Sequence, residues 1–328
     1  MLARLRQDGG GVIIMTEKRS EQAVTKQDTA AVATEAPARK RRFGDRKEGR
    51  RLRTLPAITR FMPYIMRERS DACNTYADAF NVDVTEPYCR DQVRAGKKNF
   101  TFLHVLLAAY VRTIAERPAI NRFVSGQKIY ARNEIEIVMT IKRNMTSTGE
   151  DVCIKVIFDP HDTVTEVYEK FNRTVEEALV PKENGNDFEK VNRALVSIPG
   201  FVIRMAVRLL NFLDYHGWLP RFLLRVSPFH GSMIVTSMGS LGIKPIYHHL
   251  YNFGNLPVFL AYGKKRTEYV IVADGVTERH QYVDIKAVTD ERICDGFYYA
   301  SAFKTLRRYV ENPVLLETPP ETVREDID

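Results

Sequence analysis

The sequence predicts an α+β domain, a sandwich in which helices pack on a mixed β-sheet. Three observations favour this class. Segments with strand-like alternation and segments with helical spacing follow one another without a strict strand–helix–strand order. Residues 102–116 are apolar on nearly every side, which is typical of a buried helix. Neither common glycine-rich phosphate loop is present, and this argues against a doubly wound nucleotide-binding fold.

The apolar periodicity predicts the elements in order. Helical spacing predicts helices over residues 53–69, 102–116, 163–179 and about 297–311. Alternation predicts extended segments at 75–85, 128–132, 134–142, 152–158, 232–238, 257–262, 269–273 and 281–288. The last two strands are joined through Asp274-Gly275, a dipeptide that favours a hairpin turn.

Length and composition allow a large core, since 44% of the 328 residues are hydrophobic and 27% are charged. The four cysteines are scattered without a C-x-x-C pair, so the pattern indicates neither a zinc site nor a disulfide framework. We therefore expect reduced thiols, no bound metal and a cytoplasmic protein. No apolar run reaches the roughly eighteen residues that a membrane-spanning helix needs.

The net charge of +8 is concentrated near the N-terminus. Residues 1–53 hold 14 of the 49 basic and 7 of the 41 acidic side chains, which leaves 35 basic and 34 acidic residues elsewhere. The body therefore lacks the basic excess of a nucleic-acid-binding domain, and we expect no nucleic-acid partner. Residues 1–50 are predicted to be a disordered basic leader, because blocks of like charge usually stay solvated.

Residues 198–226 are dense in apolar side chains and predict a pair of amphipathic helices. Arg204 and Arg208 share one helix face, and Arg221 and Arg225 repeat the spacing. A basic amphipathic helix can lie on an anionic membrane surface. Packing on the same domain or on a neighbouring subunit is the favoured interpretation, so a membrane surface is the less favoured partner.

The C-terminal part of the chain carries an ordered set of motifs. The strand that carries Ser237 leads into the turn Gly239-Ser-Leu-Gly242, and a second strand ends at Gly263-Lys264. Asp290-Glu-Arg-Ile-Cys-Asp-Gly296 then stands directly before the last helix. This order resembles the catalytic domain of the dihydrolipoyl acyltransferases of 2-oxoacid dehydrogenase complexes, whose motif is H-x-x-x-D-G, and its fold relative chloramphenicol acetyltransferase. The resemblance extends from about Arg51 to Leu316.

The resemblance implies a chloramphenicol acetyltransferase-like domain at 51–318, with the helical pair as an insert at 196–228 and an acidic tail at 319–328. It implies a CoA-dependent acyltransferase that uses acyl-CoA and assembles as a homotrimer or as a larger assembly of trimers, with its active-site channel between subunits. Residues 1–50 are too short for the family's lipoyl domain. The expected acceptor is therefore a lipoyl-type carrier of another protein or a small molecule with a thiol or hydroxyl group.

In that family, the motif histidine takes the proton of the acceptor, and a serine or threonine donates a hydrogen bond to the tetrahedral oxyanion. The motif aspartate holds the loop in shape through an arginine. Asp295 and Gly296 match the end of the motif, and Arg292 matches the residue after the histidine. Ser237 matches the oxyanion donor, with Thr236 as the alternative one position earlier. Three arginines are candidates for the bracing arginine: Arg60, Arg67 and Arg69.

Glu291 occupies the position of the motif histidine. A free Glu has a pKa near 4.3 and an acceptor thiol one near 8.5, so proton transfer would be uphill by roughly 5–6 kcal/mol. A pKa raised by burial would recover part of this difference. Three hypotheses stay open: Glu291 acts as the base, another base acts, or the chain is a catalytically inactive trimer that binds a ligand or serves as a scaffold.

Other groups near the motifs have simpler roles. His248 and His249 follow the glycine-containing turn and are the alternative bases, although ordinary loop hydrogen bonds are the favoured interpretation. Cys294 stands between an isoleucine and an aspartate, which suits a packing residue. Asp295 precedes a glycine and a helix, so its carboxylate is expected to cap that helix. No histidine pair has the spacing of metal ligands.

Overall fold

The computed structural model describes residues 40–142, 151–180, 198–272 and 275–328. The chain divides into two units, Met1–Lys40 and Arg41–Asp328, and all elements below belong to the second. Most of the predicted leader, residues 1–39, lies outside the described residues. The same holds for Asp274 of the predicted hairpin turn.

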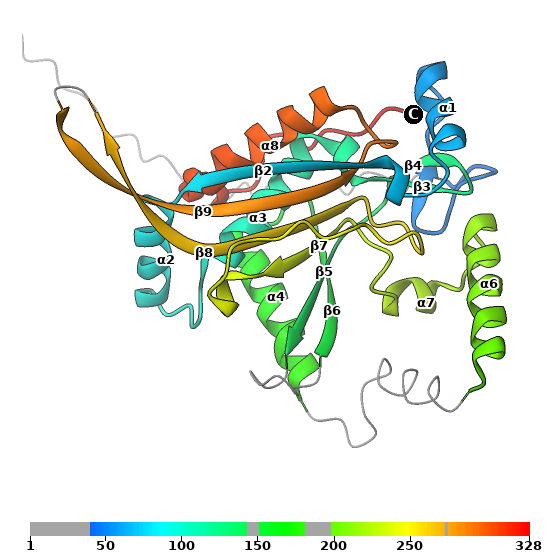
Figure 1. The fold of residues 1–328 in the computed structure, drawn as a ribbon, viewed down its shortest axis with the longest axis horizontal. Helices are drawn as coiled ribbons and strands as arrows, with labels where there is room; N and C mark the ends of the chain where they lie inside the picture. The colour runs from blue at the N-terminus through cyan, green and yellow to red at the C-terminus, as the bar shows by residue number, and fades with distance from the viewer. Residues whose placement is uncertain (1–39, 143–150, 181–197, 273–274) are drawn as a thin grey trace, which may run out of the picture. The chain divides into compact units, whose positions relative to one another are not determined.

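A mixed six-stranded sheet is the centre of the second unit (Figure 1). Its order is β2-β9-β8-β7-β5-β6, in which β7 is parallel to β5 and β8 while the other neighbours are antiparallel. This arrangement confirms the predicted α+β class with a mixed sheet. The strands are β2 (Cys73–Asn81), β5 (Ile135–Lys142), β6 (Asp151–Phe158), β7 (Met233–Ser237), β8 (Val258–Ile271) and β9 (Thr277–Asp290).

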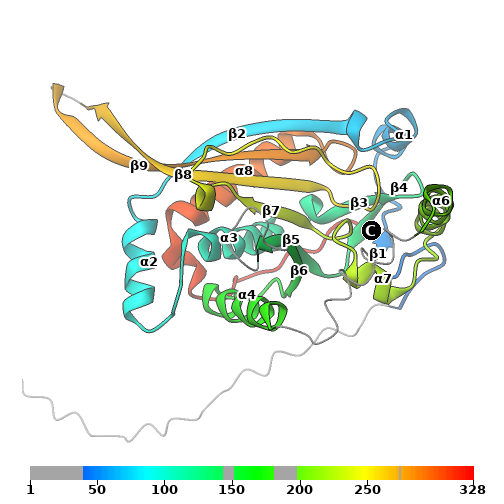
Figure 2. The ribbon, with the colours of Figure 1, turned by 60° about the horizontal axis from the view of Figure 1, so that its bottom comes forward.

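Three helices lie on one face of this sheet: α3 (Phe102–Glu116), α4 (Val164–Leu179) and α8 (Gly296–Glu311) (Figures 1 and 2). Their bounds confirm the predictions to within one residue at each end. The helices and the facing strand residues form the main core. α3 is the most enclosed of them, with 14 of its 15 residues buried.

The opposite face is covered by chain without regular structure. A second apolar cluster forms there from strand residues of β5, β7, β8 and β9 together with Leu250 and Leu256. Both leucines belong to segment 243–256, which follows the glycine-containing turn. The short 3-10 helices are η1 (Ser70–Ala72), η2 (Pro118–Asn121), η3 (Gly239–Leu241) and η5 (Pro313–Leu316).

A small antiparallel sheet has the order β1-β4-β3 and consists of β1 (Gly49–Arg51), β3 (Arg122–Ser125) and β4 (Lys128–Arg132). Residues 41–50 were expected in the disordered leader, yet they include part of β1, which pairs with β4. The acidic tail also packs on the domain, because Asp326 forms an ion pair with the buried Arg122 at 2.5 Å. Both chain ends of this unit therefore depend on pairing with distant segments.

Two predictions of local structure were incomplete. The strands expected at 257–262 and 269–273 are one strand, β8, because a bulge between Tyr262 and Lys265 carries the pairing past Gly263. A helix, α2 (Thr85–Arg94), follows β2 and was not expected. Its proline lies in the first turn, where the missing N–H breaks no helical hydrogen bond.

The helix predicted over 53–69 is shorter, α1 (Ala57–Ile65), and begins directly after Pro56. A proline before the first helical residue is compatible with the extended backbone that precedes a helix. Pro63 lies inside α1 and is its buried residue. The residues after α1 turn into η1 instead of continuing the helix, and this buries Arg69 while Arg67 stays exposed.

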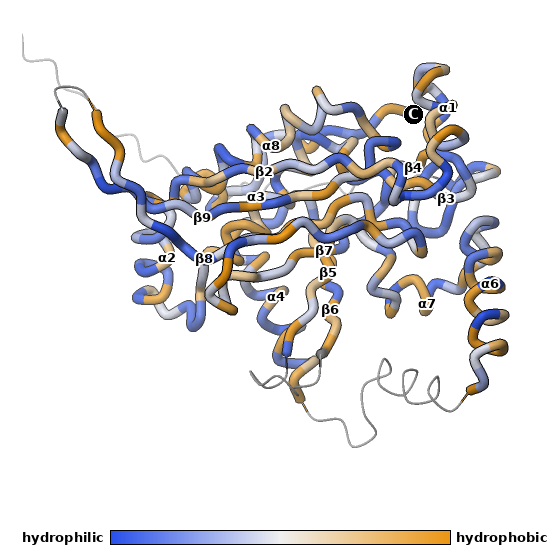
Figure 3. The backbone as a smooth tube through the Cα atoms, in the orientation of Figure 1, coloured by the Kyte–Doolittle hydropathy of each residue, from blue (hydrophilic) through white to orange (hydrophobic). Residues whose placement is uncertain are grey.

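The insert forms the two predicted helices, α6 (Gly200–His216) and α7 (Arg221–Val226). No residue of α6 is buried. Four of its apolar side chains, which we call the α6 stripe, are at least half exposed: Phe201, Met205, Leu209 and Phe212. In Figure 3, α6 has orange, hydrophobic stretches that alternate with blue, hydrophilic ones. Among the described helices, none is both long and apolar enough to cross a membrane.

Candidate active site

The motif that carries Glu291 lies between the end of β9 and the start of α8. Glu291 is exposed, and its backbone N–H donates a hydrogen bond to the carbonyl oxygen of Ala72 at 2.8 Å. The two neighbours of Glu291, Asp290 and Arg292, are buried. The chain therefore presents the glutamate outward from a loop whose flanking residues are held in the interior.

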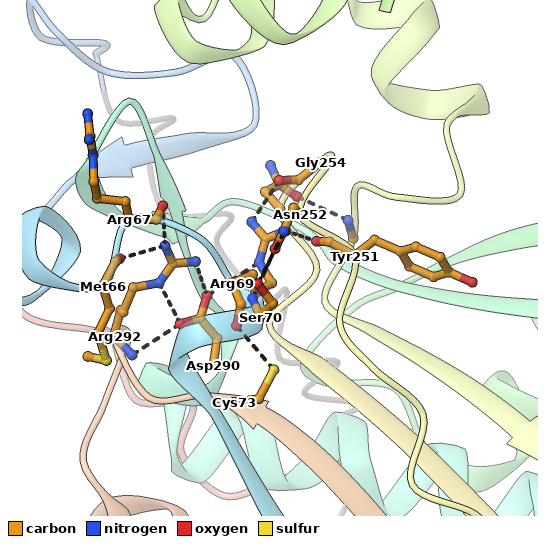
Figure 4. A network of polar contacts seen from close by, with 12 residues as sticks. Met66, Arg67, Arg69, Ser70, Cys73, Tyr251, Asn252, Gly254, Asp290 and Arg292 are labelled. Atoms are coloured by element: carbon orange, nitrogen blue, oxygen red, sulfur yellow. Dashed lines mark hydrogen bonds and ion pairs between the residues drawn. The ribbon is translucent and has the colours of Figure 1, made fainter.

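An ion-pair network fixes this loop (Figure 4). Arg292 donates to both carboxylate oxygens of Asp290, at 2.8 and 2.7 Å, and the Nε of Arg69 lies 3.4 Å from the same carboxylate. A planar guanidinium that grips both oxygens fixes direction as well as distance. Burial lowers the pKa of the Arg69 guanidinium, and the charge of Asp290 opposes that shift.

The two arginines connect the loop to two other segments. Arg292 donates to the carbonyl oxygens of Met66 and Arg67, which follow α1. Arg69 donates to the carbonyl oxygens of Tyr251 and Gly254, which belong to segment 243–256 (Figure 4). Three parts of the chain that are distant in sequence thus meet at Asp290, and each of them limits the movement of Glu291.

Asp295 has the capping role that the sequence predicts. Its Oδ1 accepts the backbone N–H of Tyr298 at 2.8 Å at the start of α8, and the residue is exposed. Of the three candidate bracing arginines, Arg69 is the buried one, and its acidic partner is Asp290 instead of Asp295. The acidic partner of the bracing arginine is therefore five residues earlier in the sequence than the family pattern implies.

Ser237 is the last residue of β7 and is half-buried. Its Oγ accepts the backbone N–H of Ser240 at 3.3 Å. Side chains alternate along a strand, so Ser237 shares the helix-covered face with Val235, whereas Thr236 points to the other face. Beside Ser237, burial raises the pKa of the Tyr262 hydroxyl, and a hydrogen bond with the serine opposes that shift.

The register of the sheet separates Ser237 from Glu291. Ser237 pairs with Tyr262 on β8, and Tyr262 pairs with Ile285 on β9. Glu291 lies six residues beyond Ile285, since 291 minus 285 is 6. At about 3.3 Å for each strand residue, the two positions are separated along the strands by about 20 Å. One chain therefore does not bring the two predicted catalytic residues together.

The alternative bases lie in segment 243–256. The ring of His248 stacks on Phe259 with 4.2 Å between centroids, and its Nδ1 is 2.9 Å from the carbonyl oxygen of His249. These are ordinary packing and loop contacts, as the sequence suggested. Within the described ranges, no hydrogen bond or ion pair joins either histidine to Glu291 or to Ser237.

Cys294 and possible metal-ligand clusters were the remaining candidates for chemistry. Cys294 is buried, and burial raises the pKa of its thiol, which makes it a packing residue. Over residues 40–142, 151–180, 198–272 and 275–328, no group of three His, Cys, Asp or Glu side chains is placed to hold a metal ion.

The sequence reasoning did not single out Asp290 or its pairing with Arg69. The signal that was available is the alternation of β9, in which Asp290 shares a face with the buried Val288. A carboxylate at a buried strand position needs a cationic partner. That partner is either Arg292, which is close in sequence, or a basic residue from elsewhere in the chain.

Comparison with known proteins is informative at the level of structure. No family model and no curated protein matches the sequence. The cubic core of the pyruvate dehydrogenase multienzyme complex matches with a TM-score of 0.51 at 13% identity, over 81% of this chain and 94% of that chain. The chain has the chloramphenicol acetyltransferase-like fold of such cores.

Two further solved structures are similar. One is a probable dihydrolipoamide acetyltransferase from Listeria monocytogenes, with a TM-score of 0.49 at 13% identity over 79% of this chain and 93% of that chain. The other is a chloramphenicol acetyltransferase, with a TM-score of 0.43 at 12% identity over 75% of this chain and 92% of that chain. By their printed names, these two solved structures are a probable dihydrolipoamide acetyltransferase and a chloramphenicol acetyltransferase.

Proposed function

We propose that this protein is a cytoplasmic CoA-dependent acyltransferase that moves an acyl group between CoA and a thiol or hydroxyl acceptor. The observation that carries the proposal is the motif Asp290–Gly296, which lies at the end of β9 and directly before α8 in a fold of acyltransferase cores. A lipoyl-type carrier or a small molecule is the proposed acceptor, and acyl-CoA is the proposed donor.

The active unit in this proposal is a homotrimer in which neighbouring chains share each site. The separation of about 20 Å between Ser237 and Glu291 supports this arrangement, because each residue then needs a partner from another chain. Glu291 of one chain would face Ser237 of its neighbour. The exposure of Glu291 in a single chain is compatible with such a contact.

The proposed reaction is an acyl transfer through a tetrahedral intermediate. The Glu291 carboxylate accepts the proton of the acceptor thiol, and the thiolate attacks the thioester carbonyl carbon. The hydroxyl of Ser237 donates a hydrogen bond to the oxyanion that forms. The intermediate then expels the CoA thiolate, which recovers the proton from Glu291. Asp290, Arg69 and Arg292 position the loop, and Asp295 caps α8.

Burial by the neighbouring chain is the physical requirement of this mechanism. A carboxylate that takes a thiol proton needs a pKa well above that of free Glu. Desolvation in a channel between chains would provide such a shift, because burial disfavours the charged form.

A second candidate function is a catalytically inactive trimer that binds a ligand or a partner. The observation in its favour is that Glu291, the residue in the histidine position, is solvent-exposed within its own chain. A carboxylate in water is a poor base for a thiol proton, so a trimer that leaves this residue exposed would be inactive.

The test is acyl transfer from a panel of acyl-CoAs to dihydrolipoamide. The proposal expects turnover by the native chain and a loss of at least about 100-fold in Glu291→Gln, as for removal of a general base. Glu321→Gln, which changes an exposed glutamate of the tail, is the matched control and should retain native turnover. Turnover only in Glu291→His would contradict the proposal and favour the second candidate.

A further inference from the structure

A cavity of about 160 Å³ lies beneath α7, outside the motifs described above. It is lined by the end of β4, the turn between β4 and β5, the start of β5, α7 and residues 47–48, and its basic side chains are Lys47, Arg132, Arg221 and Arg225. β5 and β7 are parallel, so this cavity is at the end of the sheet opposite Ser237. Its volume is also larger than the space that one water molecule needs.

Arg132 forms a buried cationic wall of the cavity. Its side chain is 1% exposed, and its Nη2 donates to Oδ1 of Asn255 at 2.7 Å. Its Nε and Nη1 have no hydrogen-bond partner among the described residues. The nearest carboxylate, that of Glu136, is 3.8 Å from Nη1, which is beyond hydrogen-bond distance. A buried guanidinium with free donors is costly unless an acceptor reaches it.

Two of the three acidic side chains that line the cavity, Glu134 and Glu136, already have cationic partners. The carboxylate of Glu136 lies between the side chains of Arg132 and Lys155. The Nζ of Lys155 is 3.9 Å from Oε2 of Glu136. Glu134 pairs with Arg225 at 3.4 Å. Counting Lys155 with the four basic lining residues gives five cations against three carboxylates, an excess of two positive charges. This excess matches a dianion.

Lys155 adds a titratable charge behind the cavity. Burial lowers the pKa of its ammonium group to about 8, and the carboxylate of Glu136 opposes the shift. The other charged or titratable groups around it are Arg132, Cys153 and Arg225. A bound anion would favour the charged form of Lys155, so binding should weaken as the pH rises above about 8.

From these observations we propose that the cavity beneath α7 binds a small dianion that carries a phosphate group or two carboxylates. Arg132 and Lys155 would provide the buried positive charge, while Arg221 and Arg225 of α7 would close over the ligand from the exposed side. Guanidinium groups suit phosphate and carboxylate oxygens, because their N–H donors match the spacing of two oxygens. The proposal does not depend on acyl transfer.

The test is titration calorimetry of the full chain at constant ionic strength, with chloride as the reference anion. Inorganic phosphate and malonate distinguish the two ligand chemistries, and sulfate, which stays a dianion, reports the pH dependence. We expect at least one of them to bind at millimolar concentration or more tightly. Arg221→Gln, which changes an exposed lining residue, should weaken binding by about tenfold, the effect of a lost charge-assisted hydrogen bond.

The matched controls are Arg204→Gln and Arg208→Gln, which change arginines of α6 that do not line the cavity. They should retain native affinity within about twofold. Arg132→Lys should abolish binding if the variant folds, and Arg221→Gln gives the answer if it does not. Absence of binding by all three anions would overturn the proposal. Equal weakening by the α6 controls would also overturn it, because it would indicate general attraction to a basic surface.

Discussion

α3 and α6 are two long, apolar helices with opposite environments. α3 buries 14 of its 15 residues between the sheet and its neighbouring helices, whereas α6 buries none of its 17. The α6 stripe is exposed to water in the single chain, although its side chains are as apolar as those of α3. Apolar composition therefore predicts a helix in both cases, but it does not predict what covers it.

The same contrast holds for charge. Asp290 and its two arginines are buried and interlocked, while the ion pair between Asp91 and Arg94 on α2 is exposed. A buried pair that loses one partner leaves an uncompensated charge in the interior. An exposed pair that loses one partner leaves the other in water. The interior of this domain therefore depends on specific polar partners as well as on apolar packing.

The largest effect is expected from the buried charges. Asp290→Asn would leave Arg69 and Arg292 without their carboxylate, and the free energy of unfolding should fall by about 3–5 kcal/mol. Urea denaturation measures this change. Asp91→Asn is the matched control in the exposed pair and should cost less than about 1 kcal/mol. Similar losses in both variants would contradict the contrast.

Truncation of one apolar side chain on each helix should have very different costs on α3 and on α6. Leu107→Ala on α3 removes a side chain that is 1% exposed, and it should destabilise the fold by about 3 kcal/mol. Leu209→Ala on α6, where the side chain is 57% exposed, should cost no more than about 0.5 kcal/mol in the isolated chain. Denaturant unfolding of both variants measures these changes in the free energy of unfolding. A large loss in Leu209→Ala would show that another chain covers the α6 stripe.

A pH dependence is expected from His104 on α3. Burial lowers the pKa of its imidazole to about 4, below the ordinary value of 6.5. Between these values the unfolded chain binds a proton that the folded chain does not, so stability is complete above pH 6.5 and falls as the pH drops toward 4. The loss should reach about 3 kcal/mol.

His104→Gln separates this effect from the role of His104 in the capping box. Glutamine at this position can still accept the backbone N–H of Thr101, but it does not titrate. Unfolding curves measured from pH 7 to pH 4 should therefore show a flatter dependence in the variant. An unchanged slope would mean that other groups cause the acid sensitivity.

The smallest effect is expected at the exposed end of the motif. Asp295→Ala removes the cap of α8 and should cost about 1 kcal/mol of stability. Asp295→Ser keeps an oxygen acceptor at the N-cap and should be nearly neutral. Thermal unfolding of the two variants measures the difference. A large loss in the serine variant would indicate that the carboxylate charge has a role beyond capping.

Much of the fold could be predicted where one physical signal dominates. The periodicity of 102–116 and the alternation of 128–132 match the bounds of α3 and β4, because burial on known faces imposes those patterns. β8 was predicted as two separate strands. The bulge that joins them depends on pairing with β9 and not on the local sequence.

The site was less accessible to prediction for a related reason. The role of Asp295 as a cap is local and was predicted, whereas the brace joins Asp290 to Arg69 across most of the chain. The distance between Ser237 and Glu291 follows from the strand register, which no single segment specifies. The cavity beneath α7 likewise requires segments that the sequence keeps far apart.

Subunit mixing tests whether Glu291 of one chain acts together with Ser237 of a neighbouring chain. Glu291→Gln and Ser237→Ala should each be inactive alone. Refolding an equal mixture should restore about a quarter of native acyl transfer, since one in four interfaces of a random trimer then carries both intact residues. A mixture that stays inactive while the native chain turns over acyl-CoA would show that the two residues do not act across an interface between chains.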